Sequence, residues 1–190
     1  YGVIGLSLFA AAYSLYGGLS AVAWTDVIQV IFLVFGGLVT SYLALNTVSD
    51  GQGVLAGIKV VYETVPEKFV MILDKSNPEY SNLPGLGVLV GGLWVANLYY
   101  WGFNQYIIQR TLAAKSLRES QKGIILAAFL KIIIPLIVVV PGIAAYVMVK
   151  DAEILNRLGD AGLQNLPTLE QADKAYPWLL QFLPTGLKGV

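Results

Sequence analysis

Two side-chain amides and two large aromatic rings share one face of a predicted helix near the middle of the chain. Asn97, Tyr100, Trp101 and Asn104 stand at i, i+3, i+4 and i+7 of an uncharged run, which is the spacing of neighbours along a helix. Amides offer paired donors and acceptors to hydroxyl groups, and a tyrosine ring can stack on the apolar face of a sugar. The pattern favours a binding face for a small uncharged polyol, although the same residues would also suit packing against neighbouring helices.

Lys131 is the one charged residue between positions 123 and 149. A charge at the centre of a membrane helix costs about 2.5–3.5 kcal/mol on insertion scales, so a lysine there needs compensation. Its ammonium could reach the membrane surface along its four-carbon stem, or it could serve as a donor in a polar cavity. Pro135 cannot donate a hydrogen bond to the Lys131 carbonyl, which predicts a kink and a free acceptor beside the ammonium.

Asp26 and Arg110 are predicted near helix ends on one side of the membrane. An acid at a helix N-terminus and a base at a C-terminus each gain about 0.3–1 kcal/mol from the helix dipole, and this effect alone would explain both residues. A shared role in a cytoplasmic exit path is the alternative hypothesis.

The composition is that of a membrane protein. Of 190 residues, 56% are hydrophobic and 13% charged, against about 25% charged in soluble domains. Twelve basic residues balance twelve acidic ones, which argues against a nucleic-acid partner. The sequence contains no cysteine and no histidine, so neither thiol chemistry nor the commonest general base is available.

Charge and turn residues divide the chain into an all-α arrangement of four membrane helices and the approach to a fifth. The first and last residues lie in or beside apolar sequence, so we expect residues 1–190 to be a fragment of one transmembrane domain. The predicted helices are 1–18, 25–47, a discontinuous helix at 85–109, a kinked helix at 123–149 and the start of the next helix at 177–190. The predicted loops are 50–84, with an amphipathic helix near 52–65, then 110–122 and 150–176.

The loop charges predict the orientation. The short segment 110–122 holds four bases and one acid, whereas 50–84 and 150–176 each hold five acids and three bases. By the positive-inside rule the basic segment is cytoplasmic. The turn after residue 18 then also faces the cytoplasm, and the two acidic loops face outside.

Three stretches resemble the sodium:solute symporter family. Tyr13 to Ala21, with Gly17-Gly18-Leu19 inside it, is similar to the end of the family signature, and 109–116 and 176–180 also look like the family. The similarity covers the whole chain, and with Asn97 to Trp101 and Lys131 added the chain closely resembles bacterial members of the family that carry galactose. It implies part of a ten-helix core of two inverted five-helix repeats that works by alternating access in the bacterial inner (plasma) membrane.

The resemblance also implies roles for single residues. Asn97 and Lys131 would hydrogen-bond the sugar, Tyr100 would stack on it as the inner gate, and Trp101 would lie beside Tyr100. Asp26 would be a way station for sodium leaving to the cytoplasm, with Arg110 near that path. The main sodium ligands are expected on helices outside this chain, so we assign no metal ligand here. The expected partners are a hexose, sodium as coupling ion, the lipid bilayer and the remaining helices of the same transporter, with no organic cofactor.

The sequence therefore predicts sodium-coupled symport of a hexose, galactose or glucose, with no covalent chemistry. A family member that carries another solute, such as an amino acid, a vitamin or an anion, is an alternative. A membrane-embedded glycosyl-processing enzyme would need a close acid–base pair, whereas Asp26 is the only carboxylate near a membrane segment. A channel is a third alternative, for which the sequence shows no ring-forming filter motif.

Overall fold

The computed structural model describes residues 1–70, 72–81, 85–184 and 186. In these residues all regular secondary structure is helical, which confirms the predicted all-α class. By length and hydropathy, α1 (Gly2–Val48) and α5 (Leu117–Lys150) could each cross a membrane, and Val88–Phe103 is a shorter apolar helix.

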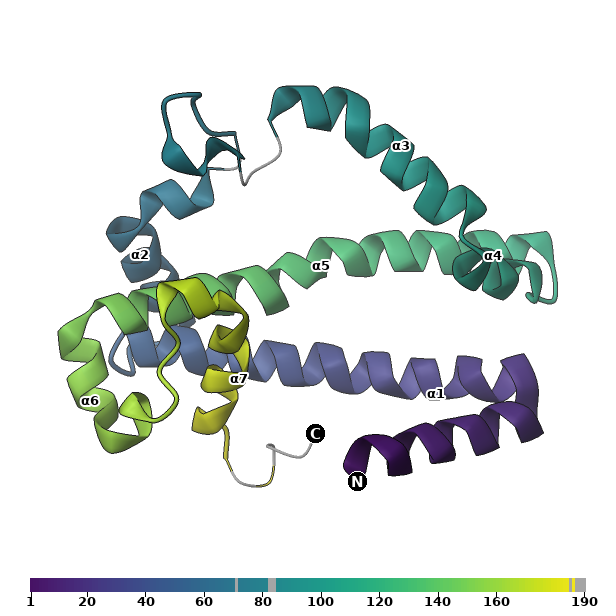
Figure 1. The fold of residues 1–190 in the computed structure, drawn as a ribbon, viewed down its shortest axis with the longest axis horizontal. Helices are drawn as coiled ribbons and strands as arrows, with labels where there is room; N and C mark the ends of the chain where they lie inside the picture. Colours follow the sequence, from purple (N-terminus) through teal and green to yellow (C-terminus); the bar gives the residue numbers. More distant parts are fainter. Residues whose placement is uncertain (71, 82–84, 185, 187–190) are drawn as a thin grey trace.

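The first helix, α1, has two arms that fold back on each other at Gly18 (Figure 1). Gly18 has φ 56° and ψ −152°, a region of backbone space open essentially only to glycine. The predicted helices 1–18 and 25–47 correspond to the two arms, but the predicted connection at 19–24 is already helical. One glycine makes the turn, and residues 19–24 contain neither glycine nor proline to interrupt the second arm.

The second arm of α1 packs along α5, which continues as one helix through Pro135 and Pro141. A Cβ on Gly37 would lie 2.8 Å from the Cβ of Ile137, so the missing side chain permits the close approach. Ser41 Oγ donates a hydrogen bond to the carbonyl oxygen of Leu136 at 2.8 Å. Figure 1 shows α5 changing direction along its second half.

The buried core gathers at the end of α1 and α5 that is farther from Gly18 (Figure 1). There α2 (Val54–Thr64) lies so close to α1 that a Cβ on Gly57 would overlap the carbonyl oxygen of Leu45. Trp178 of α7 (Ala175–Leu179) is buried and donates its indole N–H to the carbonyl of Gly162 at 3.2 Å. The core residues are Ala44, Leu45, Val48, Val61, Val65, Ala144, Ala145, Val147, Met148, Ile154, Trp178 and Leu179.

Residues 85–122 differ from the predicted helix and loop. The helix passes through a π-helical segment at Val88–Gly92, α3 (Leu93–Leu98) and a second π-helical segment at Tyr99–Phe103. It breaks at Asn104 and restarts as α4 (Gln105–Leu112). The predicted 110–122 loop shrinks to residues 113–116, because Ser116 caps α5 by accepting the backbone N–H of Glu119 at 3.3 Å. Serine followed by glutamate three residues later is a helix-start signature.

The last quarter of the chain is more helical than predicted. In the predicted loop 150–176, Asp151 caps α6 (Ala152–Leu163) by accepting the N–H groups of Glu153 and Ile154 at 2.9 and 3.3 Å. The helix expected to start at 177 begins at Ala175 and ends by Phe182. Leu183 precedes a proline, which favours the extended conformation it adopts. Residues 185 and 187–190 of the predicted next helix lie outside the described residues.

Candidate binding site and ion pair

Tyr100 and Trp101 lie in the π-helical segment Tyr99–Phe103. Their rings are perpendicular, with centroids 5.4 Å apart and an interplanar angle of 85°, an edge-to-face geometry that aromatic pairs favour. A π-helix has more residues per turn than an α-helix, and such segments are frequent at functional sites. More residues per turn means a smaller angle between consecutive side chains, so two neighbouring rings can both face one group on another helix.

That group is the ammonium of Lys131 on α5. Its Nζ lies 4.7 Å from the ring centroid of Trp101 and 5.1 Å from that of Tyr100, both within the range of a cation–π interaction. Among the described residues no carboxylate forms an ion pair with Lys131. The structure thus brings together three of the predicted site residues, and ring faces compensate the charge.

The two amides of the predicted face bond the backbone of their own segment, whereas the rings face Lys131. Asn97 Nδ2 donates to the carbonyl of Leu93, four residues back, at 2.8 Å, and no described contact joins Asn97 to Lys131. Among the described residues none donates a hydrogen bond to the Asn97 amide oxygen, so this oxygen can accept one from a ligand. Asn104 has a structural role: its Oδ1 accepts the backbone N–H of Tyr106 at 3.0 Å and caps α4.

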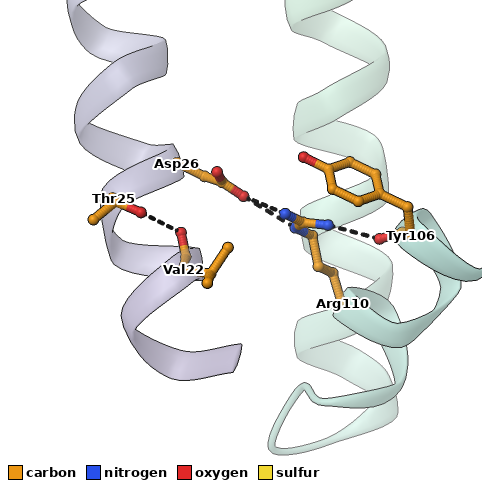
Figure 2. A network of polar contacts seen from close by, with 5 residues as sticks. All are labelled: Val22, Thr25, Asp26, Tyr106 and Arg110. Atoms are coloured by element: carbon orange, nitrogen blue, oxygen red, sulfur yellow. Dashed lines mark hydrogen bonds and ion pairs between the residues drawn. The ribbon is translucent and has the colours of Figure 1, made fainter. Parts of the chain in front are cut away.

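Asp26 and Arg110 form a direct ion pair between α1 and α4 (Figure 2). Arg110 donates from Nη2 at 2.6 Å and from Nε at 3.1 Å, and both bonds end on Oδ2 of Asp26. The Arg110 side chain is 23% exposed and that of Asp26 35%. In the described part of the chain the second carboxylate oxygen, Oδ1, accepts no hydrogen bond, so it can take a further cation.

The local setting of Asp26 corrects the prediction that Thr25 and Asp26 begin a helix. Both residues lie inside α1, and the Thr25 hydroxyl donates to the carbonyl of Val22 at 2.8 Å (Figure 2). The dipole explanation therefore fails for Asp26, since the helix already starts after Gly18. Arg110 does lie in the last turn of α4, as a helix-end base would.

Tyr106 is the residue that sequence reasoning missed. Its backbone carbonyl accepts a hydrogen bond from Nη1 of Arg110 at 2.7 Å, and its ring centroid lies 3.7 Å from the central carbon of the guanidinium (Figure 2). The i, i+4 spacing of Tyr106 and Arg110 was the signal that could have found the contact. No group of three potential acidic metal ligands forms among the described residues, and the location of the main sodium ligands outside this chain stays a prediction.

Comparisons with known proteins agree on one family. The model of the "Sodium:solute symporter family" matches residues 1–190. A sodium/glucose cotransporter of Vibrio parahaemolyticus is 63% identical over 190 residues, which are 100% of this chain and 35% of the relative. An uncharacterized symporter, YidK, of Escherichia coli is 37% identical over 98% of this chain and 29% of its own length.

A more distant relative is the human sodium/myo-inositol cotransporter 2, which is 31% identical over 99% of this chain and 29% of its own length. The chain thus spans about a third of the length of the relatives it matches. A match from the first residue to the last decides the classification, and the chain belongs to the sodium:solute symporter family.

Proposed function

We propose that the protein containing this chain is a sodium-coupled symporter of a hexose, galactose or glucose, in a bacterial inner (plasma) membrane. It moves its cargo by alternating access and makes or breaks no covalent bond. The observation that carries the proposal is the Lys131 ammonium facing Tyr100 and Trp101 at a π-helical segment, with no acidic partner among the described residues.

The geometry suits a neutral hydroxylated ring. Lys131 has three N–H donors, and the free Asn97 oxygen can accept from a hydroxyl on the same ligand. A ring face of Tyr100 can pack on the apolar face of the sugar. A cationic amine would be repelled by the lysine, which argues against a basic amino acid as cargo.

The position of Lys131 suits the middle of a transport path. It follows the start of α5 by fourteen residues, or about 21 Å at the helical rise, in a bilayer whose apolar core is about 30 Å thick. Exposed apolar side chains cover both arms of α1, including Phe9, Trp24 and Phe35. We propose that the remaining helices of the transporter and the lipid cover them.

Asp26 and Arg110 mark the proposed cytoplasmic side. Through their contact, the Gly18 turn and the basic residues that follow α4 lie at the same end of the long helices α1 and α5 (Figure 1). By the positive-inside rule that end faces the cytoplasm. Asp26, with its free Oδ1, would receive sodium on its way to the cytoplasm, and Arg110 would help to release it.

Uptake of labelled galactose by proteoliposomes containing the full-length protein tests the proposal. We expect uptake to require an inward sodium gradient and to fall in Asn97→Ala and Lys131→Ala. Asn156→Ala and Lys115→Ala change exposed residues of the same types far from the rings and should transport normally. Equal uptake with and without the gradient would refute symport.

Competition by unlabelled solutes then decides the cargo class. Glucose should compete with labelled galactose, whereas proline and iodide should not. Strong competition by proline or iodide would instead support the alternative of an amino acid or anion symporter. If both alanine variants kept normal sugar affinity, the site assignment would fail even with transport intact.

A further inference from the structure

Tyr106 stands between the break in the helix and the Asp26–Arg110 ion pair. On one side its backbone N–H donates to Oδ1 of Asn104, the residue at which the helix breaks, at 3.0 Å. On the other side it contacts Arg110 through both its carbonyl and its ring. A single residue therefore joins the end of the π-helical segment to the ion pair.

The contacts of Tyr106 fix the position of the Arg110 guanidinium. Nη1 donates to the Tyr106 carbonyl at 2.7 Å, while Nε and Nη2 both donate to Asp26. The Tyr106 ring lies against the guanidinium, 3.7 Å from its central carbon (Figure 2). With all three nitrogens engaged and one face covered, the guanidinium is held to Asp26 at 2.6 Å.

The short α4 transmits this arrangement. It has eight residues, with its cap at Asn104 and Arg110 in its last turn, so a tilt of α4 about the break moves Arg110 relative to α1. Tyr100 and Trp101, which face Lys131, lie immediately before that break. Tyr106 thus lies on the short stretch of chain that connects the two rings to the ion pair.

We propose that Tyr106 is a positioning residue that holds Arg110 on Asp26 and so sets how strongly this carboxylate attracts sodium. The role has meaning only in a sodium symporter, so the assignment rests on the proposed function. Arg110 and sodium compete for the same carboxylate. Loss of the Tyr106 ring should loosen Arg110 and make sodium on the cytoplasmic side bind more tightly.

Inhibition of uptake by internal sodium measures this competition. The assay uses the full-length symporter in right-side-out membrane vesicles loaded with graded sodium. For Tyr106→Leu we expect the internal sodium concentration that halves galactose uptake to fall roughly two- to fivefold, the worth of one cation–π contact at an exposed site, because Tyr106 is 61% exposed. The half-saturating galactose concentration should stay within about twofold, because α4 carries no residue of the proposed sugar site.

Two variants separate positioning from simple structural support. Tyr106→Phe keeps the ring and should behave like the natural protein. Tyr42→Leu removes an exposed tyrosine of α1, 52% exposed, and should also have no effect. If Tyr106→Leu cannot be recovered folded, Tyr106→Met, whose longer and unbranched side chain adapts more easily to the space left by the ring, should show the same fall. In an Asp26→Asn background, Tyr106→Leu should cause no further change.

The outcomes distinguish the two proposals. Uptake by the natural protein that needs no sodium would overturn the proposed function and this assignment with it. Sodium-dependent uptake in which Tyr106→Leu and Tyr106→Met leave internal inhibition unchanged would overturn the assignment of Tyr106 alone. An equal fall in the inhibiting sodium concentration for Tyr106→Phe would also refute it. So would the same fall when Tyr106→Leu is added to Asp26→Asn.

Discussion

Replacing Lys131 by methionine tests the centre of the proposed sugar site. Methionine keeps an unbranched apolar chain of similar length and removes the ammonium that lies 4.7 and 5.1 Å from the two ring centroids. It leaves no buried charge unpaired, because no described carboxylate pairs with Lys131. The change should therefore affect ligand binding far more than folding.

The expected loss follows from two opposing contributions. A hydrogen bond from a charged donor to a sugar hydroxyl is worth about 1.5–3 kcal/mol. To make it, the ammonium has to leave at least part of its contact with Tyr100 and Trp101, which costs about 0.5–1 kcal/mol at an exposed site. The difference is about 1–2 kcal/mol, which corresponds to roughly 5- to 30-fold weaker sugar binding.

Equilibrium binding of labelled galactose at saturating sodium measures this loss on the full-length protein in detergent. Lys131→Arg keeps the charge and the cation–π contacts and should lose less affinity than Lys131→Met. Lys115→Met, in the turn before α5, controls for loss of a lysine elsewhere. Unchanged galactose affinity in a folded Lys131→Met protein would show that the ammonium does not bind the sugar.

Three further changes test what positions the site. Gly18→Ala forces a side chain into a backbone region essentially closed to it and should cost about 1–3 kcal/mol, measured as a lower midpoint of thermal unfolding. Gly57→Ala places a Cβ onto the Leu45 carbonyl and should cost about 1–3 kcal/mol by overpacking; an unshifted midpoint would mean that α2 is not seated on α1. Asn104→Ala removes the α4 cap and should cost about 1 kcal/mol, with Asn104→Asp, which keeps the acceptor, close to the natural protein in the same measurement.

Local signals in the sequence account for the helices better than for their ends. Apolar runs identified α1 and α5, and the dense polarity around Asn104 indicated a discontinuous helix. The Ser116 and Glu119 pair was readable as a helix start, yet the basic residues around it suggested a loop, and the predicted start at 123 was six residues late. Charged residues can continue a helix beyond the membrane, so hydropathy alone does not mark where it begins.

Contacts between distant residues explain the rest of the difference. Asp26 and Arg110 are 84 positions apart, and their helical surroundings give no reason to pair one with the other. The sequence placed both at one side of the membrane only through loop charges. The ion pair itself depends on where Gly18 turns the chain and where Asn104 interrupts it, and each of these positions is set by a single residue.

The two aromatic rings that offset the charge of Lys131 explain why an irregular helical segment accompanies the proposed site. In a regular α-helix, consecutive side chains diverge by about 100°, so Tyr100 and Trp101 would meet one ammonium less readily. The π-helical segment brings both rings to Lys131, and its end at Asn104 frees α4 to carry Arg110 toward Asp26. One irregular stretch thus both offsets a costly charge and connects it to the ion pair, and a change that restored a regular helix there should disturb both together.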